Sequence, residues 1–335
     1  MELQPEEQLA AQRPTRTPRF IQGALPAGND VAKTLVAGLQ EPTANIPARF
    51  LYDELGSCLF DAITALPEYY PTRTEAAVLE KNLPAMAKEH DSVGGTLIDL
   101  GAGTCEKAPK LFPYVKPTQY VPVDISVEFL RTAVHRLQHD HPDISMVGVG
   151  TDFSSKLELP DEVGQQRRLF FYPGSSIGNF SRDEAIAFLK GVRSAMDAEG
   201  QLWIGIDLRK DIATMVRAYD DEIGVTAAFS RNTLRNTNRL AGTDFSPRHW
   251  DHVALFNEEH SRVEMHLEAK QDVVVRWPGG ERKFTAGERI HTENSHKYTQ
   301  DGFSELLAEA GLETSGCWTD EKKWFGVFVA VPAGR

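Results

Sequence analysis

The chain has 335 residues, 41% of them hydrophobic and 25% charged, which is ordinary for a globular protein of one large or two closely joined domains. Its net charge of −12 argues against a nucleic-acid partner, because contact with a phosphate backbone needs a basic surface. No apolar run approaches the roughly 20 residues of a membrane span, and the N-terminal residues lack the apolar core of a secretory signal, so we expect a cytoplasmic protein without a membrane partner.

The N-terminal part of the chain predicts a tail followed by helices. Residues 1–20 are polar and punctuated by proline, which predicts a disordered tail. A helical pattern covers 28–40, and an aromatic-rich stretch follows over 50–70. Thr72 and Glu75 have the spacing of a capping box, which predicts a helix that begins there.

The next part of the chain alternates between apolar strands and helical patterns, as βαβ units of a parallel sheet do. A second capping box, formed by Ser181 and Glu184, predicts the start of one connecting helix. We expect the five strands near 96–100, 119–123, 145–150, 168–173 and 201–207. The sequence therefore predicts an α/β protein built on a Rossmann-like sheet.

Beyond residue 208 the pattern changes to helix followed by antiparallel strands. Residues 210–240 look helical, whereas 262–269 place apolar and charged side chains alternately, as a strand with one buried face does. The Pro-Gly-Gly sequence at 278–280 predicts a hairpin turn, and a further strand is expected over 289–298.

The last part of the chain predicts a return to the first sheet. A helix near 301–311 precedes strands near 314–319 and 325–331, which would form an antiparallel edge. A cleft between two lobes would hold the substrate. The predicted parts are a tail at 1–20, a substrate-binding α+β lobe from 21–71 plus 210–297, and a cofactor-binding domain from 72–209 plus 298–335.

The first three strands of the parallel sheet end in residues suited to a nucleoside. Gly101 lets the backbone approach a ligand, and Asp124 can accept hydrogen bonds from ribose hydroxyls. Asp152 suits an adenine amine, with Phe153 beside the ring. An ordinary tight turn at Gly101, a cap at Asp124 and a turn at Asp152 are the alternatives.

The residue after the glycine turn separates two cofactor classes. A dinucleotide fingerprint needs a third glycine where this chain has Glu106, and a carboxylate is unfavourable beside a pyrophosphate. S-adenosylmethionine instead carries a sulfonium and an ammonium, so it is the expected cofactor. Lys107 is either a solvated lysine or a partner for the cofactor's carboxylate.

Longer segments carry a more specific signal, above all the aromatic Phe50–Asp61 and the Thr-Ala-Ala-Phe of 226–229. The other matching segments are 66–75, 101–107, 174–180, 218–225, 264–265 and 292–295. Through these the chain resembles the S-adenosylmethionine-dependent histidine Nα-methyltransferases of ergothioneine biosynthesis, which convert L-histidine to its trimethyl betaine, hercynine. The resemblance runs from about Arg49 to the C-terminus.

The resemblance implies a class I methyltransferase sheet with a second lobe and two sets of binding residues. The cofactor would contact Gly101, Lys107, Asp124, Asp152 and Phe153. Histidine would be held by Tyr69, Asn179, Tyr219, Glu293 and Ser295, with Tyr52, Phe60, Gly174, Ser176 and Met265 completing the pocket. Several relatives carry threonine at position 176, where serine keeps the hydroxyl.

The chemistry of histidine suits these residue types. Asn179 and Tyr219 can donate to the substrate carboxylate, while Glu293 and Ser295, two apart in a strand, can share a face toward the imidazole. The alternative for the last two is a solvated strand. Tyr52 is expected to orient the α-amine and only secondarily to act as a base, and Tyr69 can hydrogen-bond the imidazole. Phe60 suits a methylated cation.

We therefore expect an enzyme that methylates the α-amine of L-histidine up to three times and works as a monomer. The alternatives are a methyltransferase for another amino acid such as tryptophan, a nicotinamide oxidoreductase and a non-catalytic binding module. Neither the three cysteines nor the ten histidines have metal-ligand spacing, so we expect reduced thiols and no metal.

Overall fold

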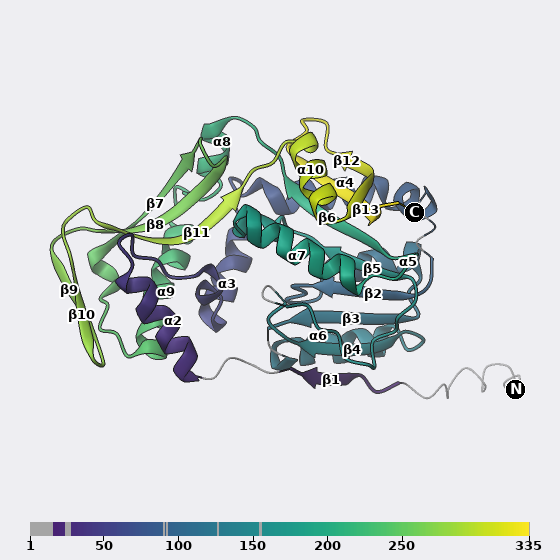
Figure 1. Cartoon of the computed structure of the whole chain (residues 1–335), viewed down its shortest axis with the longest axis horizontal. Helices are drawn as coiled ribbons and strands as arrows, with labels where there is room; N and C mark the ends of the chain where they lie inside the picture. The colour runs from purple at the N-terminus through teal and green to yellow at the C-terminus, as the bar shows by residue number, and fades with distance from the viewer. Residues whose placement is uncertain are drawn as a thin grey trace, which may run out of the picture.

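A computed structural model describes residues 16–23, 28–89, 91, 93–125, 127–153 and 156–334. Two parts are visible in Figure 1, a large sheet flanked by helices and a smaller assembly of strands and helices beside it. Within the described ranges, no helix is both long and apolar enough to cross a bilayer.

The large sheet has eight strands in the order β1-β4-β3-β2-β5-β6-β13-β12. The first six run parallel, and β13 and β12 add an antiparallel edge. This arrangement confirms the predicted Rossmann-like sheet and the return of the chain's last strands to it. The strands are β1 (Arg19–Gln22), β2 (Thr96–Leu100), β3 (Gln119–Asp124), β4 (Ser145–Gly150), β5 (Arg168–Tyr172), β6 (Gln201–Asp207), β12 (Leu312–Thr319) and β13 (Phe325–Pro332).

Helices cover both faces of this sheet because its side chains alternate between two cores. Leu97 lies in one core with residues of α4 (Tyr70–Glu89), α5 (Phe112–Val115) and α6 (Val127–Asp140). Ile98, its neighbour on β2, lies in the other core with residues of α7 (Arg182–Ala195) and α10 (Gln300–Glu309). Strands buried on both faces explain the nearly continuous apolar runs in the sequence.

The second part is built around a three-stranded antiparallel sheet, β11-β8-β7, and the hairpin β9-β10. Its core contains side chains far apart in the sequence, among them Leu35, Leu234, Trp250 and Ile290. The strands are β7 (Trp250–Asn257), β8 (Arg262–Ala269), β9 (Val273–Trp277), β10 (Gly280–Phe284) and β11 (Arg289–His296). The helices are α2 (Gly28–Gln40), α3 (Glu54–Thr64), α8 (Ile212–Arg217) and α9 (Val225–Ala241).

The structure corrects the predicted N-terminal boundaries. Strand β1 pairs with β4 at the edge of the large sheet, so the predicted tail is wrong at residues 19–20 and the predicted lobe is wrong at 21–22. Gly148 makes this pairing possible, because a Cβ there would lie 2.8 Å from the Phe20 ring. Residues 1–15 of the predicted tail lie outside the described residues.

The two predicted capping boxes have opposite outcomes. Ser181 and Glu184 form both reciprocal hydrogen bonds at the start of α7, as predicted. The box of Thr72 and Glu75 is wrong, because α4 already begins at Tyr70 and the Glu75 carboxylate has distant partners instead. Strand β7 was not predicted.

Candidate active site

A pocket lies where the two parts of the protein meet. All ten residues expected to hold histidine line it. They come from the 52–69 segment, the loop after β5, the turn after α8, and strands β8 and β11: Tyr52, Phe60, Tyr69, Gly174, Ser176, Asn179, Tyr219, Met265, Glu293 and Ser295. Their individual roles stay predictions.

The pocket also contains five residues that sequence reasoning missed. Thr226, Phe229 and Ser230 lie on the first turns of α9, at the three- and four-residue spacing of one helix face. Ile63 on α3 and Ser175 complete the lining. The helical spacing within the Thr-Ala-Ala-Phe segment was the available signal, but it does not show which face meets a ligand.

One wall of the pocket is aromatic. The ring centroids of Tyr52 and Phe60 lie 5.5 Å apart, those of Phe60 and Tyr69 6.1 Å, and those of Tyr69 and Tyr219 5.9 Å. All three pairs are edge-to-face. Such a wall suits an organic cation, because ring faces carry negative electrostatic potential.

Glu293 is the acidic group of the pocket. The Asn179 amide donates to its Oε1 at 3.2 Å. Burial raises the pKa of Glu293 to about 7, although the charge of Lys297 and hydrogen bonds from Tyr52 and Asn179 act in the opposite direction. A carboxyl that titrates near neutrality can accept an N–H from a ligand, and its own protonation controls that ability.

The hydroxyls of Tyr219 and Ser295 form a pair that shares the Lys297 ammonium with Asp207. Their oxygens lie 2.7 Å apart, and the Lys297 ammonium donates to Tyr219 Oη at 2.9 Å and to Ser295 Oγ at 2.7 Å. Lys297 also donates to Asp207 Oδ2 at 2.6 Å. The two hydroxyls expected to bind different ends of histidine are therefore neighbours.

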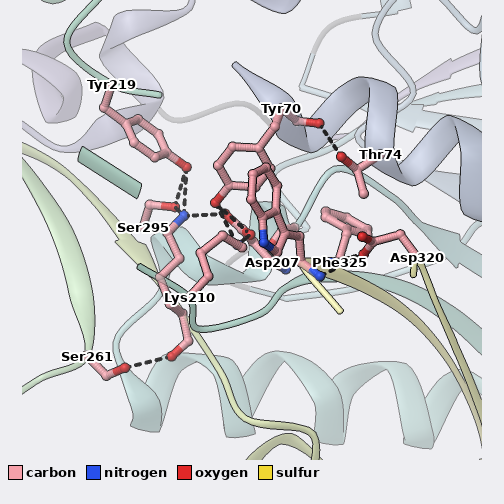
Figure 2. A network of polar contacts seen from close by, with 12 residues as sticks. Tyr70, Thr74, Asp207, Lys210, Tyr219, Ser261, Ser295, Asp320 and Phe325 are labelled. Carbon is pink, nitrogen blue, oxygen red and sulfur yellow. Dashed lines mark hydrogen bonds and ion pairs between the residues drawn. The ribbon is translucent and has the colours of Figure 1, made fainter. Parts of the chain in front are cut away.

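Behind this pair lies a buried charge cluster that sequence reasoning missed, shown in Figure 2. Asp207 at the end of β6 receives hydrogen bonds from Tyr70 at 2.8 and 2.9 Å and an ion pair from Lys210. Burial alone would raise the pKa of Asp207, but Lys297 and Lys210 outweigh it and lower that pKa. Burial lowers the pKa of Lys210 to about 8.

The expected cofactor residues lie at the carboxyl ends of the parallel strands. Gly101 and Gly103 have φ of 69° and 51°, and a Cβ added to Gly103 would meet nothing within 4 Å. Asp124 accepts hydrogen bonds from the backbone N–H of Gly103 at 3.0 Å and of Ile125 at 2.7 Å. An open glycine turn fixed by a carboxylate fits a nucleoside cofactor.

Phe153 and Asp152 follow β4, as expected. A Cβ on Gly101 would lie 3.7 Å from the Phe153 ring, and that ring meets Tyr172 edge-on with centroids 6.0 Å apart. Asp152 lies 3.9 Å from the Arg49 guanidinium, measured between charged atoms. The structure thus brings Gly101 and Phe153 together, while Asp152 also faces the segment that precedes α3.

Lys107 links the cofactor edge to the pocket through Glu75. Its ammonium donates to Glu75 Oε2 at 2.7 Å, and Glu75 Oε1 accepts the Gly174 backbone N–H at 2.7 Å. A Cβ on Gly174, which lines the pocket, would lie 3.4 Å from Lys107 Nζ. Lys107 is therefore not a simple solvated lysine, because it already has a carboxylate partner in Glu75.

No group of three or more metal-ligating side chains that could hold an ion occurs among the residues described. The pocket instead offers a titrating carboxyl, hydroxyl donors and an aromatic wall. This donor set suits a small molecule that combines a carboxylate, an amine and a polar ring.

Comparison with known proteins agrees with this chemistry. Residues 31–332 match the family described as histidine-specific methyltransferase, SAM-dependent. Histidine N-alpha-methyltransferase of Mycolicibacterium smegmatis is 38% identical over 313 residues, which cover 91% of this chain and 96% of that protein.

Two further relatives differ in length or in the substrate they are named for. Ergothioneine biosynthesis protein 1 of Neurospora crassa is 33% identical over 82% of this chain, which corresponds to 32% of that longer protein. L-tryptophan methyltransferase trpM of Psilocybe serbica is 28% identical over 86% of this chain and 89% of that protein.

Proposed function

The chain belongs to the family of histidine-specific, S-adenosylmethionine-dependent methyltransferases, and from this premise we propose that it transfers methyl groups to the α-amine of L-histidine, giving hercynine. The observation that supports this most is that all ten residues expected to hold the substrate histidine line one pocket. A relative named for ergothioneine biosynthesis supports the same pathway here. A cytoplasmic, monomeric enzyme stays our prediction.

In this proposal Glu293 recognises the imidazole. Its half-buried carboxylate would accept an imidazole N–H, and a site built around such a pair rejects ligands that leave the carboxylate unpaired. The Tyr219–Ser295 pair and the Asn179 amide supply the donors for the remaining polar atoms of the amino acid.

The α-amine must be neutral when it attacks the methyl group, so a proton has to leave before each transfer. Tyr52 is 40% exposed as a residue, but desolvation of its hydroxyl inside the pocket and the neighbouring Glu293 carboxylate raise the pKa of that hydroxyl above its usual range, so it is a hydrogen-bond donor at neutral pH rather than a base. We therefore favour an orienting role for Tyr52. Phe60, beside it, presents a ring to the trimethylated cation.

The cofactor supplies an electrophilic methyl group on a sulfonium. In the proposal Asp124 holds the ribose, Phe153 lies beside the adenine and Asp152 accepts its amine, while Gly101 leaves room for the nucleoside. Lys107, next to Gly174, would face the cofactor's carboxylate where the two sites meet. The protein's contribution is alignment of amine and methyl group.

The proposal is tested by mass spectrometry of the products formed from an equimolar amino-acid mixture and S-adenosylmethionine. We expect histidine alone to gain methyl groups, up to three. A methylated tryptophan would establish the alternative substrate, and the absence of any methylated amino acid would refute the activity.

Replacement of Glu293 tests whether histidine methylation depends on this pocket. Glu293→Ala should raise the KM for histidine at least about tenfold, because a buried charged hydrogen bond is lost. Glu313→Ala, which removes an exposed carboxylate from β12, is the matched control and should behave like the wild type. Unchanged histidine kinetics in Glu293→Ala would remove the imidazole assignment.

A further inference from the structure

Lys297 is a fully buried lysine that does not line the pocket but contacts two side chains that do. Its side chain has 0% exposure and its partner Asp207 has 1%. Tyr219 and Ser295 both belong to the pocket lining and both accept hydrogen bonds from Lys297. Figure 2 shows these two hydroxyl side chains turned toward the buried charge cluster.

A count of hydrogens shows what Lys297 imposes on this pair. Its three N–H groups each have an acceptor, in Asp207, Tyr219 and Ser295. The two hydroxyls lie 2.7 Å apart, so one hydroxyl hydrogen lies between them. One hydroxyl hydrogen is left, and the pair therefore meets a pocket ligand as a donor backed by a positive charge.

The rest of the cluster keeps that positive charge in place. Asp207 also pairs with Lys210, and Tyr70 donates to both of its oxygens. Two ammonium groups thus face the Asp207 carboxylate, with Asp320 as a second carboxylate that acts on Lys210, so the positive charge that contacts the hydroxyl pair is the Lys297 ammonium. Glu293 provides negative charge at a separate point of the lining. The pocket is polarised, with an acceptor at Glu293 and a donor at the hydroxyl pair.

We propose that Lys297 is a positioning residue that fixes the Tyr219 and Ser295 hydroxyls so that their remaining hydrogen meets the carboxylate of a free amino acid. The proposal rests on the function proposed above. It explains why a pocket for an anionic group contains no arginine or lysine among its lining residues: the cation lies one layer behind, and neutral hydroxyls transmit its field.

The test compares two buried lysines of the same cluster. Lys297→Met removes the ammonium behind the hydroxyls, whereas Lys210→Met removes the other partner of Asp207 without touching the hydroxyl pair. Either change leaves one lysine facing Asp207, so both variants keep a paired carboxylate. S-adenosylhomocysteine affinity, measured by calorimetry, should match the wild type in both.

Histidine and histidinol, which lacks the carboxylate, provide the readout. Lys297→Met should weaken histidine binding about tenfold more than histidinol binding, because the lost donor serves only the carboxylate, whereas a change in the Glu293 pKa acts on the imidazole of both ligands. The KM for histidine should rise more than kcat falls. Lys210→Met should change neither affinity more than about twofold. Equal losses for both ligands, or equal losses in both variants, would overturn the positioning role.

The pH dependence of kcat/KM is a further measurement, which the loss of a purely structural lysine would not change. Glu293 faces Lys297 together with the hydroxyls of Tyr52, Tyr69 and Tyr219, and Lys297 is the cation that lowers its pKa. Lys297→Met should therefore shift the acidic limb of kcat/KM for histidine to higher pH, and Lys210→Met should leave it in place. An unshifted limb in Lys297→Met contradicts the proposal.

A second variant covers the case in which Lys297→Met does not fold. Tyr219→Phe combined with Ser295→Ala keeps the lysine and removes both hydroxyls. This variant should therefore also lose more affinity for histidine than for histidinol. Equal losses of affinity for histidine and histidinol in this variant, relative to the wild type, overturn the proposal. Wild-type protein that binds S-adenosylhomocysteine but never histidine would instead refute the proposed function itself.

Discussion

Glu293 is a half-buried carboxyl whose ionised form is disfavoured in the folded protein. Its pKa of about 7 in the folded protein lies above the usual 4.5, because burial disfavours the charged form. The folded state therefore binds this proton more tightly than the unfolded chain does. The stability that depends on this proton is complete at low pH and is lost as pH rises through about 7.

Replacing Glu293 by glutamine should remove that pH dependence. We expect Glu293→Gln to have a higher Tm than the wild type at about pH 8 and no advantage at about pH 4, since glutamine carries no charge to bury. Differential scanning calorimetry across this range measures the difference. A Tm advantage that does not vary with pH would show that Glu293 is not the titrating group.

Asp124 gives a corresponding prediction for the cofactor. Its two carboxylate oxygens hold the N–H groups of Gly103 and Ile125, and asparagine can replace only one of them as an acceptor. Asp124→Asn should weaken S-adenosylhomocysteine binding roughly tenfold, as measured by calorimetry. Asp161→Asn, at an exposed site, is the control. Equal affinity in both variants would remove the ribose assignment.

At the scale of elements, helix α4 connects the two sites. Its Glu75 is 2% exposed and joins Lys107, after β2, to the loop after β5 through Gly174. The position of Gly174 in the pocket therefore depends on a carboxylate from another element. This contact also explains the failed capping box, because the distant partners offer Glu75 a stronger interaction than the local backbone does.

Glu75→Gln should test this connection. Glutamine can still accept the Gly174 N–H but loses the charge that pairs with Lys107, which is itself 38% exposed and can be rehydrated. We expect a loss of about 1–2 kcal/mol in the free energy of unfolding, less than for a fully buried pair. Urea denaturation measures it. A matched control is Glu80→Gln, an exposed site on the same helix.

The sequence allowed the large sheet to be predicted because its signals are local. Apolar runs, glycine turns and the capping box at Ser181 lie within single βα units, and those strands occur as expected. Strand β1 is only four residues long and β7 has a weak burial alternation, so neither stands out in the sequence. Strand β1 depends on pairing with β4, which is distant in the chain. Strand β7 depends on pairing with β8, in which apolar and charged side chains alternate more clearly.

At the scale of the whole molecule, family resemblance rather than pattern identified the pocket residues. Tyr52, Asn179 and Glu293 come from three separate segments, and no local pattern indicates that they meet. The charge cluster was missed for the same reason: Asp207 looks like the end of a strand, and Lys297 completes a two-residue spacing with Glu293 and Ser295 that also fits a solvated strand.

Hydrogen exchange should separate the two sites across the whole chain. S-adenosylhomocysteine alone should slow exchange at the strand ends and turns of the cofactor edge, within 99–107, 121–125 and 150–153. Histidine added afterwards should protect 52–69, 174–179 and 291–296, because these segments form the pocket. Histidine protection confined to one segment would contradict a shared pocket.

The spread of the pocket along the chain also bears on how the protein is synthesised. Its wall joins Tyr52 with Ser295, and the lysine behind it is Lys297. A polypeptide that ends before residue 297 lacks part of the pocket or the lysine behind it. Such truncated translation products should therefore not bind the amino acid. Proteolytic removal of the last quarter of the chain should likewise abolish binding.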